Sequence, residues 1–308
     1  MIRAFDWRDV GLVKTLGEHG ICLDSEVGLT RGCHPLPDAL WAYLMPGARP
    51  PTLVWRENQQ AAFGQLRHRL GQEQARVAFV APARAAAADG WPLVVEQLAA
   101  EAGRRGAHNL IAETSEESPE FEVLRAAGFA VYARQSVWKL SQPLQVAPSA
   151  LGLRAATSAD MIGISLLYAN IVPRLVQQVE PPPASARGYV LQHDGELSAF
   201  IDVRRGPLGI WLDPYLHPEA YDLSGAVVQA ALNLLPNSAG LPVYICVRRY
   251  QDWLQDILAQ AGFEALGAQA ILVKRLAARV MEPVLKPLPA VDHQATTPIV
   301  RARVTKRE

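Results

Sequence analysis

Ile2-Arg3-Ala4, followed by Asp9-Val10, returns in the second half of the chain as Leu153-Arg154-Ala155, followed by Asp160-Met161. The two copies are 151 residues apart, and each places a short apolar segment before an acidic residue that can begin a helix. The stretch therefore predicts that each half begins with a strand and a helix in the same order.

A second repeated segment lies near the other end of each half. Leu124-Arg125-Ala126-Ala127-Gly128-Phe129 returns 134 residues later as Leu258-Ala259-Gln260-Ala261-Gly262-Phe263, and each copy leads into a long apolar stretch. The difference between the two offsets makes the second copy 17 residues shorter internally. We expect two homologous α/β domains, at residues 1–140 and 151–276.

Composition agrees with two domains, because 308 residues suit two units of roughly 150 each. The formal net charge is zero, so no global field favours nucleic acid or an anionic membrane, and we expect neither partner. Cys22, Cys33 and Cys246 are widely spaced without a Cys-x-x-Cys pair, which predicts reduced thiols in a cytoplasmic protein and no metal site.

The expected elements follow the same order in both halves. The first half predicts a strand at 2–5, helices after 9 and 37, a three-strand meander within 53–80, a helix at 93–102, then strand, helix and strand at 109–113, 119–127 and 130–140. The second half predicts a strand at 152–155, one long helix at 158–178, strands at 188–192, 197–203 and 208–216, a helix at 220–234, then strand, helix and strand at 242–247, 251–261 and 264–276. Residues 141–150 are expected to form a linker, and the tail at 277–308 is expected to be mobile.

This order resembles the GNAT superfamily of acyl-CoA-dependent N-acyltransferases over residues 1–140 and 152–276. The resemblance implies a mixed, mostly antiparallel sheet flanked by helices in each half, and an acyl-CoA bound between splayed central strands. In that family a loop of the pattern (Arg/Gln)-x-x-Gly-x-(Gly/Ala) cradles the CoA pyrophosphate at a helix N-terminus, where backbone N–H groups face the anion.

The CoA loop matches this pattern only in part. In the first half Val80-Ala81-Pro82 fits the end of the strand, Arg84 fits the basic position, and Ala88-Asp89-Gly90 followed by Trp91 replaces the glycine motif. In the second half Leu216-His217-Pro218 is followed by two acids and one glycine. The resemblance implies that Val80, Arg84, Ala88, Asp89, Gly90 and Trp91 bind the cofactor. The alternative is that both loops are plain connections with Asp89 and Asp222 as N-caps.

The family's general acid is absent from both halves. A tyrosine four residues before the Gly-Phe pair often protonates the departing thiolate, and Leu124 and Leu258 stand in its place. Tyr132, Tyr244 or Tyr250 would have to supply the proton, unless water does or no acid is used.

Glu113 and Asp213 are the candidate general bases, because each is expected on or at the end of a central strand. The resemblance implies an acyl-CoA-dependent N-acyltransferase, with acetyl-CoA as co-substrate, a small amine as acceptor and at most one functional site. A monomer with pseudo-twofold pairing of its domains is the expected assembly. The alternative is a non-catalytic acyl-CoA-binding or protein-interaction module built from two degenerate domains.

Overall fold

The computed structural model describes residues 1–45, 47, 49–83, 90–141, 151–193, 195–235 and 240–276. The predicted linker, apart from Ser141, and the predicted tail, apart from residue 276 just before it, lie outside these ranges.

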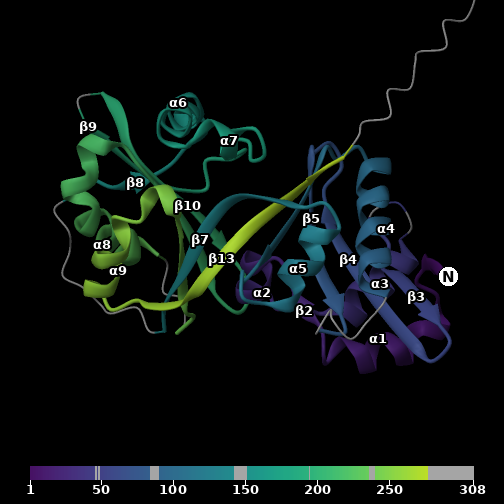
Figure 1. The fold of residues 1–308 in the computed structure, drawn as a ribbon. Coiled ribbons are helices and arrows are strands. Elements are labelled where there is room, and N and C mark those ends of the chain that lie inside the picture. The colour runs from purple at the N-terminus through teal and green to yellow at the C-terminus, as the bar shows by residue number, and fades with distance from the viewer. Residues whose placement is uncertain are drawn as a thin grey trace, which may run out of the picture. The chain divides into compact units, whose positions relative to one another are not determined.

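The first half follows the predicted order with two short additions (Figure 1). Its elements are β1 (Ile2–Ala4), α1 (Val10–Gly17), β2 (Ile21–Cys22), α2 (Ser25–Thr30), α3 (Pro35–Leu44), β3 (Leu53–Glu57), β4 (Gln60–His68), β5 (Gln74–Ala81), α4 (Gly90–Arg104), β6 (Asn109–Thr114), α5 (Pro119–Ala126) and β7 (Ala130–Leu140). The additions β2 and α2 carry too few residues to show a period in the sequence.

The second half repeats this order with fewer elements before its meander. It contains β8 (Arg154–Ala155), α6 (Met161–Ile171), α7 (Arg174–Gln177), β9 (Gly188–His193), β10 (Glu196–Arg205), β11 (Ile210–Leu216), α8 (Ser224–Leu234), β12 (Val243–Arg248), α9 (Leu254–Gln260) and β13 (Glu264–Arg275). The single helix predicted at 158–178 is wrong, because Pro173 separates α6 from α7 and proline cannot continue a helix from within.

Both repeated segments in the sequence have a structural cause. Arg3 pairs with buried Asp9, with Nη1 and Oδ2 2.6 Å apart, and Arg154 pairs with Asp160 in the same way, with Nη2 and Oδ1 2.7 Å apart. Each pair ties the first strand of a half to the helical turn that follows it, where the aspartate also accepts a backbone N–H.

The repeated Gly-Phe segment is a helix C-cap. Gly128 and Gly262 adopt φ of 85° and 84°, the left-handed conformation that glycine tolerates best. The N–H of Phe129 donates to the carbonyl of Leu124 at 3.0 Å, and Phe263 donates to Leu258 at 2.9 Å, the pattern of a Schellman motif. Leu124 and Leu258 are fully buried, so these two positions belong to the core.

One continuous sheet joins the two halves, because each gives its last strand to the other. The strand order is β1-β3-β4-β5-β6-β13-β7-β12-β11-β10-β9-β8, so β13 of the second half lies between β6 and β7 of the first. Figure 1 shows β13 running alongside β7. Likewise β7 of the first half pairs with β12 of the second. The mixed, mostly antiparallel α/β sheet that the sequence predicts is confirmed.

A pseudo-twofold axis passes between β13 and β7. Gln135 and Gln269 occupy equivalent positions in the two copies and are also register partners across these antiparallel strands. The Gln135 amide donates to Gln269 Oε1 at 3.1 Å, and Ser25 and Cys246 each hydrogen-bond one of the two glutamines. The axis therefore passes through a partly buried polar contact between two copies of the same residue.

Residues 1–140 expressed alone should not form a stable folded monomer, since β6 and β7 would both lose the strand that lies between them. Far-UV circular dichroism and size-exclusion chromatography would check this, and adding the separately purified 141–308 fragment should restore the folded complex. A monomeric 1–140 fragment with a cooperative melting transition would contradict the exchange.

Candidate functional site

Two pairs of central strands separate part-way along their length. β5 and β6 are parallel and pair only from Gln74 to Arg76, and β11 and β12 pair only from Ile210 to Leu212. We call the unpaired parts beyond them the first gap, between residues 77–81 and 112–114, and the second gap, between residues 213–216 and 246–248. Backbone groups that line such a gap need partners other than the facing strand.

The first gap is closed by the main chain of Leu23. Its N–H donates to the carbonyl of Ala78 in β5 at 3.1 Å, and its carbonyl accepts the N–H of Glu113 in β6 at 2.9 Å. The preceding residues form β2, which pairs with Phe79 and Val80. Leu23 is 1% exposed, so the first gap is filled by the protein itself.

The second gap is bridged by a side chain. The Gln251 amide nitrogen donates to the carbonyl of Pro214 in β11 at 2.6 Å, and Gln251 Oε1 accepts the N–H of Arg248 in β12 at 3.3 Å. Gln251 is buried at the start of the connection to α9. In the described chain the main chain itself does not enter this gap.

A cavity of about 200 Å³ adjoins the second gap and is lined by ionisable groups. They are three arginines, three carboxylates and three tyrosines: Arg76, Arg204, Arg248, Glu180, Asp202, Asp213, Tyr168, Tyr215 and Tyr250. We call this the polar cavity. Its residues come from both halves, because Arg76 lies on β5 while most of the others lie on β10 to β12 and on the loop after α7.

Ion pairs hold the charges around the polar cavity. Arg248 Nη2 lies 2.9 Å from both oxygens of Glu180, and Arg76 pairs closely with Glu113. Arg204 reaches Glu26 at 2.7 Å and pairs closely with Asp213, whose other oxygen accepts the Trp211 indole N–H at 3.0 Å.

The environments of the carboxylates differ. Burial alone would raise the pKa of Glu113 and of Glu180, but the neighbouring arginines outweigh it and hold both pKa values below their usual range. Burial raises the pKa of Asp202, and Arg204, 3.4 Å away, offsets this only in part. Asp202 is thus the carboxylate of this cavity whose shift favours taking up a proton.

Two phenols of the polar cavity have free hydroxyls. The Tyr215 and Tyr250 hydroxyls make no hydrogen bond within the described residues, whereas Tyr168 donates to the carbonyl of Glu180 at 2.7 Å. Burial raises the pKa of Tyr250 and of Tyr215, so both phenols are protonated at neutral pH. Burial also raises the pKa of the Cys246 thiol to about 11.

The residues expected to act as bases lie in different surroundings. Asp213 lines the polar cavity, whereas Glu113 is 5% exposed and is held by Arg76 and the N–H of Ser25. Of the other tyrosines considered, Tyr132 donates to Glu180 and Tyr244 is buried among apolar residues.

The described residues of the expected cofactor loop are packed inside the first half. Val80 pairs with Ile21, and the Trp91 indole donates to the carbonyl of Pro82 at 2.7 Å. Gly90 lies against the Trp55 ring, where a Cβ atom would come within 2.2 Å. Arg84, Ala88 and Asp89 lie outside the described residues.

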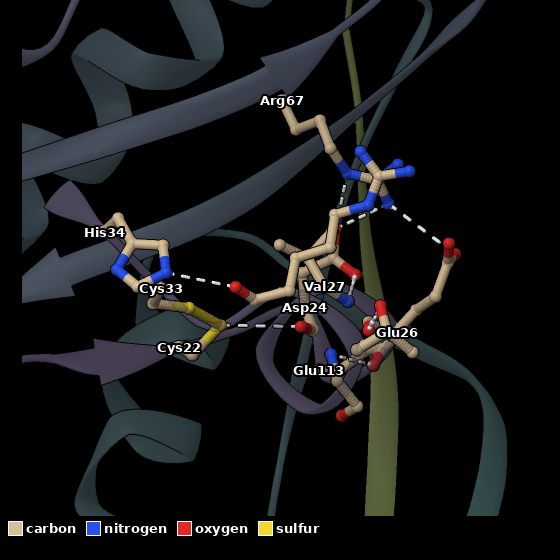
Figure 2. Close-up of a disulfide and its surroundings, with 11 residues drawn as sticks. Cys22, Asp24, Glu26, Val27, Cys33, His34, Arg67 and Glu113 are labelled. Atoms are coloured by element: carbon tan, nitrogen blue, oxygen red, sulfur yellow. Dashed lines mark hydrogen bonds and ion pairs between the residues drawn. A yellow bond between two sulfur atoms is a disulfide. The ribbon is translucent and has the colours of Figure 1, made fainter. Parts of the chain in front are cut away.

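A second cavity of about 730 Å³ lies beside α2 and β13. Cys22, which lines this cavity, forms a disulfide with Cys33 next to buried Asp24, and Arg67 holds Asp24 through an Nε hydrogen bond of 2.7 Å (Figure 2). The expectation of reduced thiols is therefore wrong for this pair, because the loop carrying α2 returns the two cysteines to one place; Cys246 is free and buried.

Sequence reasoning missed Asp202 and Gln251. Asp202 and Arg204 alternate with the apolar residues Ile201 and Val203 along β10, a period-two signal that places both polar residues on one face and could have been noticed. Gln251 gives no signal, since its role depends on where β11 lies. No helix in the described part is long and apolar enough to cross a membrane, and no cluster of three metal-ligating side chains occurs there.

Comparison with solved structures identifies the fold. A GCN5-related N-acetyltransferase from Sphaerobacter thermophilus superposes with a TM-score of 0.56 at 14% identity, covering 89% of this chain and 95% of that one. A tandem GNAT protein from the clavulanic acid biosynthesis pathway gives a TM-score of 0.52 at 15% identity, covering 89% and 98%. No family model matches the sequence, and the search of curated proteins found no significant match.

Replacing Glu113 by Gln should lower the free energy of unfolding by roughly 3 kcal/mol, because it leaves the Arg76 guanidinium partly buried without its counter-charge. Urea denaturation at pH 7 would measure it. Glu116→Gln is the matched control, since the exposed Glu116–Arg134 pair should contribute no more than about 1 kcal/mol. Equal, small losses in both variants would contradict a structural role for Glu113.

The contribution of Glu113 to the free energy of unfolding should depend on pH. Its folded pKa lies below the unfolded value of about 4.3, so the contribution is complete above that pH and is lost as pH falls through the lower folded pKa. Denaturation curves between pH 3 and 7 should therefore show a smaller loss of stability on acidification for Glu113→Gln than for the wild type. An identical pH dependence would count against the ion pair.

Proposed function

Because this chain has the fold of the tandem GNAT proteins, we propose that it is an acyl-CoA-dependent N-acyltransferase whose single reaction site is the second gap with the polar cavity. Acetyl-CoA is the proposed donor and a small amine the proposed acceptor. The observation that carries the proposal is the contrast between the gaps: main chain fills the first, whereas one side chain bridges the second beside a cavity with a carboxylate and a free phenol.

The second gap suits the acyl and amide portion of such a donor. The carbonyl of Pro214 can accept, and the N–H of Arg248 can donate, the two hydrogen bonds that an amide group makes. The turn from His217 to Ser224 is less suited to phosphates, since it carries Glu219 and Asp222 and no arginine or lysine. The donor would therefore be held mainly through its thioester arm.

Proton transfers follow from the groups that line the cavity. Asp202 would take a proton from the acceptor ammonium, because burial raises its pKa. Asp213 is engaged by Arg204 and by the Trp211 indole N–H. The free amine attacks the thioester carbonyl, and the carbon–sulfur bond breaks. The departing thiolate takes the proton of the Tyr250 hydroxyl, and the N-protonated amide then gives its surplus proton to the Tyr250 phenolate, which restores the phenol. Asp202 releases to solvent the proton that it took from the acceptor. Tyr250 would thus supply the acid that Leu124 and Leu258 cannot.

The first half would then serve as the structural partner. Its gap opens only if β2 leaves β5, and the loop that follows β2 is closed by the Cys22–Cys33 disulfide. The positions Val80, Gly90 and Trp91 are accordingly assigned to packing in this proposal, and donor binding to the second half. A non-catalytic module remains the second candidate, favoured by the closure of the first gap.

Tyr250→Phe should lower the rate of thiol release from acetyl-CoA by about 100-fold and leave the acetyl-CoA dissociation constant within about twofold, as expected for loss of a general acid. Thiol release across a panel of small amines, with isothermal titration of acetyl-CoA, measures both. Tyr221→Phe is the control, because Tyr221 stacks on Trp253 at 4.0 Å between ring centres and lies outside the polar cavity. An unchanged rate in Tyr250→Phe would contradict its role. Acetyl-CoA binding without thiol release for any amine would favour a non-catalytic acyl-CoA-binding module, and no acetyl-CoA binding by the wild type would favour a protein-interaction module.

Asp202→Asn should lower kcat/KM by about 100-fold and remove the rise of kcat/KM with pH that its titration produces. In the wild type the rate should rise as Asp202 loses its proton, at a pH above the usual range for an aspartate because burial raises its pKa. Asp256→Asn is the control, because Asp256 is exposed on α9 and lies outside the polar cavity. A pH profile that Asp202→Asn leaves unchanged would assign the base elsewhere.

A further inference from the structure

Both gaps are closed by an amide at the same place in the fold. The register of the parallel pairs makes Gln74 equivalent to Ile210, so Ala78 of the first half is equivalent to Pro214 of the second. The carbonyl of Ala78 accepts the peptide N–H of Leu23, and the carbonyl of Pro214 accepts the carboxamide N–H of Gln251. In each half the carbonyl of that amide accepts a backbone N–H from the facing strand.

The two closures differ in how they can be undone. Leu23 is part of the main chain and is continuous with β2, so the first gap opens only if a strand detaches. Gln251 closes the second gap through one side chain, and rotation about its own bonds removes both hydrogen bonds without moving the backbone. Gln251 also lines the polar cavity, into which the side chain can turn.

We propose that the Gln251 carboxamide is an internal substitute for a ligand amide, which closes the second gap in the free protein and is displaced when the amide-containing arm of the acyl donor enters. The inference rests on the function proposed above. It adds a displaceable group and a chemical requirement on the ligand: an amide that donates to the Pro214 carbonyl and accepts from the Arg248 N–H.

Displacement lowers the apparent affinity of the donor. The binding-competent form of the protein is the one with Gln251 turned away, so the observed dissociation constant exceeds the intrinsic one by the inverse of that fraction. The entering amide replaces the two hydrogen bonds that Gln251 gives up. A thioester without an amide leaves two buried backbone groups unsatisfied and binds poorly.

The test is isothermal titration of acetyl-CoA into the full chain carrying Gln251→Ala or Gln251→Met. Removal of a buried hydrogen-bonded plug should tighten binding by roughly 2- to 10-fold in Gln251→Ala. Gln251→Met keeps the volume without the hydrogen bonds and should bind more tightly than the wild type but less tightly than Gln251→Ala. Melting temperatures would confirm that the variants fold. If Gln251→Ala does not fold, the affinity of Gln251→Met provides the test.

Glu117→Ala is the matched control, because Glu117 is exposed and occupies in the first half the position that Gln251 has in the second. Its affinity should equal that of the wild type. If the wild type binds acetyl-CoA and both Gln251 variants bind it equally or more weakly, the donor does not displace the Gln251 carboxamide. That result would contradict this inference and leave the proposed function standing. No binding by any of the proteins would overturn both proposals.

Discussion

The pairing of β13 with β6 and β7 is the constraint on which the rest of the structure depends. In the first half β7 does not pair with β6. The strand that pairs with β6 on that side is β13, which comes from the second half. Each half contributes its last strand to the neighbourhood of the other. Gln135 and Gln269 are therefore register partners across β7 and β13, and they also lie on the pseudo-twofold axis. The halves are thereby bound as one sheet, and the polar cavity is assembled from residues of both.

The same physical requirement acts at each gap and is met in two ways. Parallel strands that diverge expose backbone carbonyls and N–H groups, and such groups are not left unpaired when buried. In the first half Leu23, directly after β2, supplies a main-chain peptide group, whereas the shorter second half has only α7 between α6 and β9 and uses the Gln251 side chain. The segment between the first helix and the meander is thus shorter in the second half, where no strand equivalent to β2 occurs among the described residues.

The site was partly accessible from the sequence. Asp213 could be placed on a central strand and lies in the polar cavity, and Glu113 could be placed on the equivalent strand, but the sequence does not show that Arg76 faces it. Leu124 and Leu258 could be recognised as departures from the family, and the structure adds that both are buried in the Schellman caps of their helices. Asp202 was missed because its importance lies in its burial beside Arg204.

The sequence alone determined the duplication, the order of elements in each half and the GNAT-like fold, since strand and helix periods, aspartate caps and Gly-Phe helix ends are local signals that lie within a few residues of each other. Only the tertiary structure decided that the last strands are exchanged, that Leu23 fills one gap and Gln251 the other, and that Cys22 meets Cys33. These features depend on contacts between residues far apart in the chain, where equivalent sequence patterns allow several partners and packing selects one.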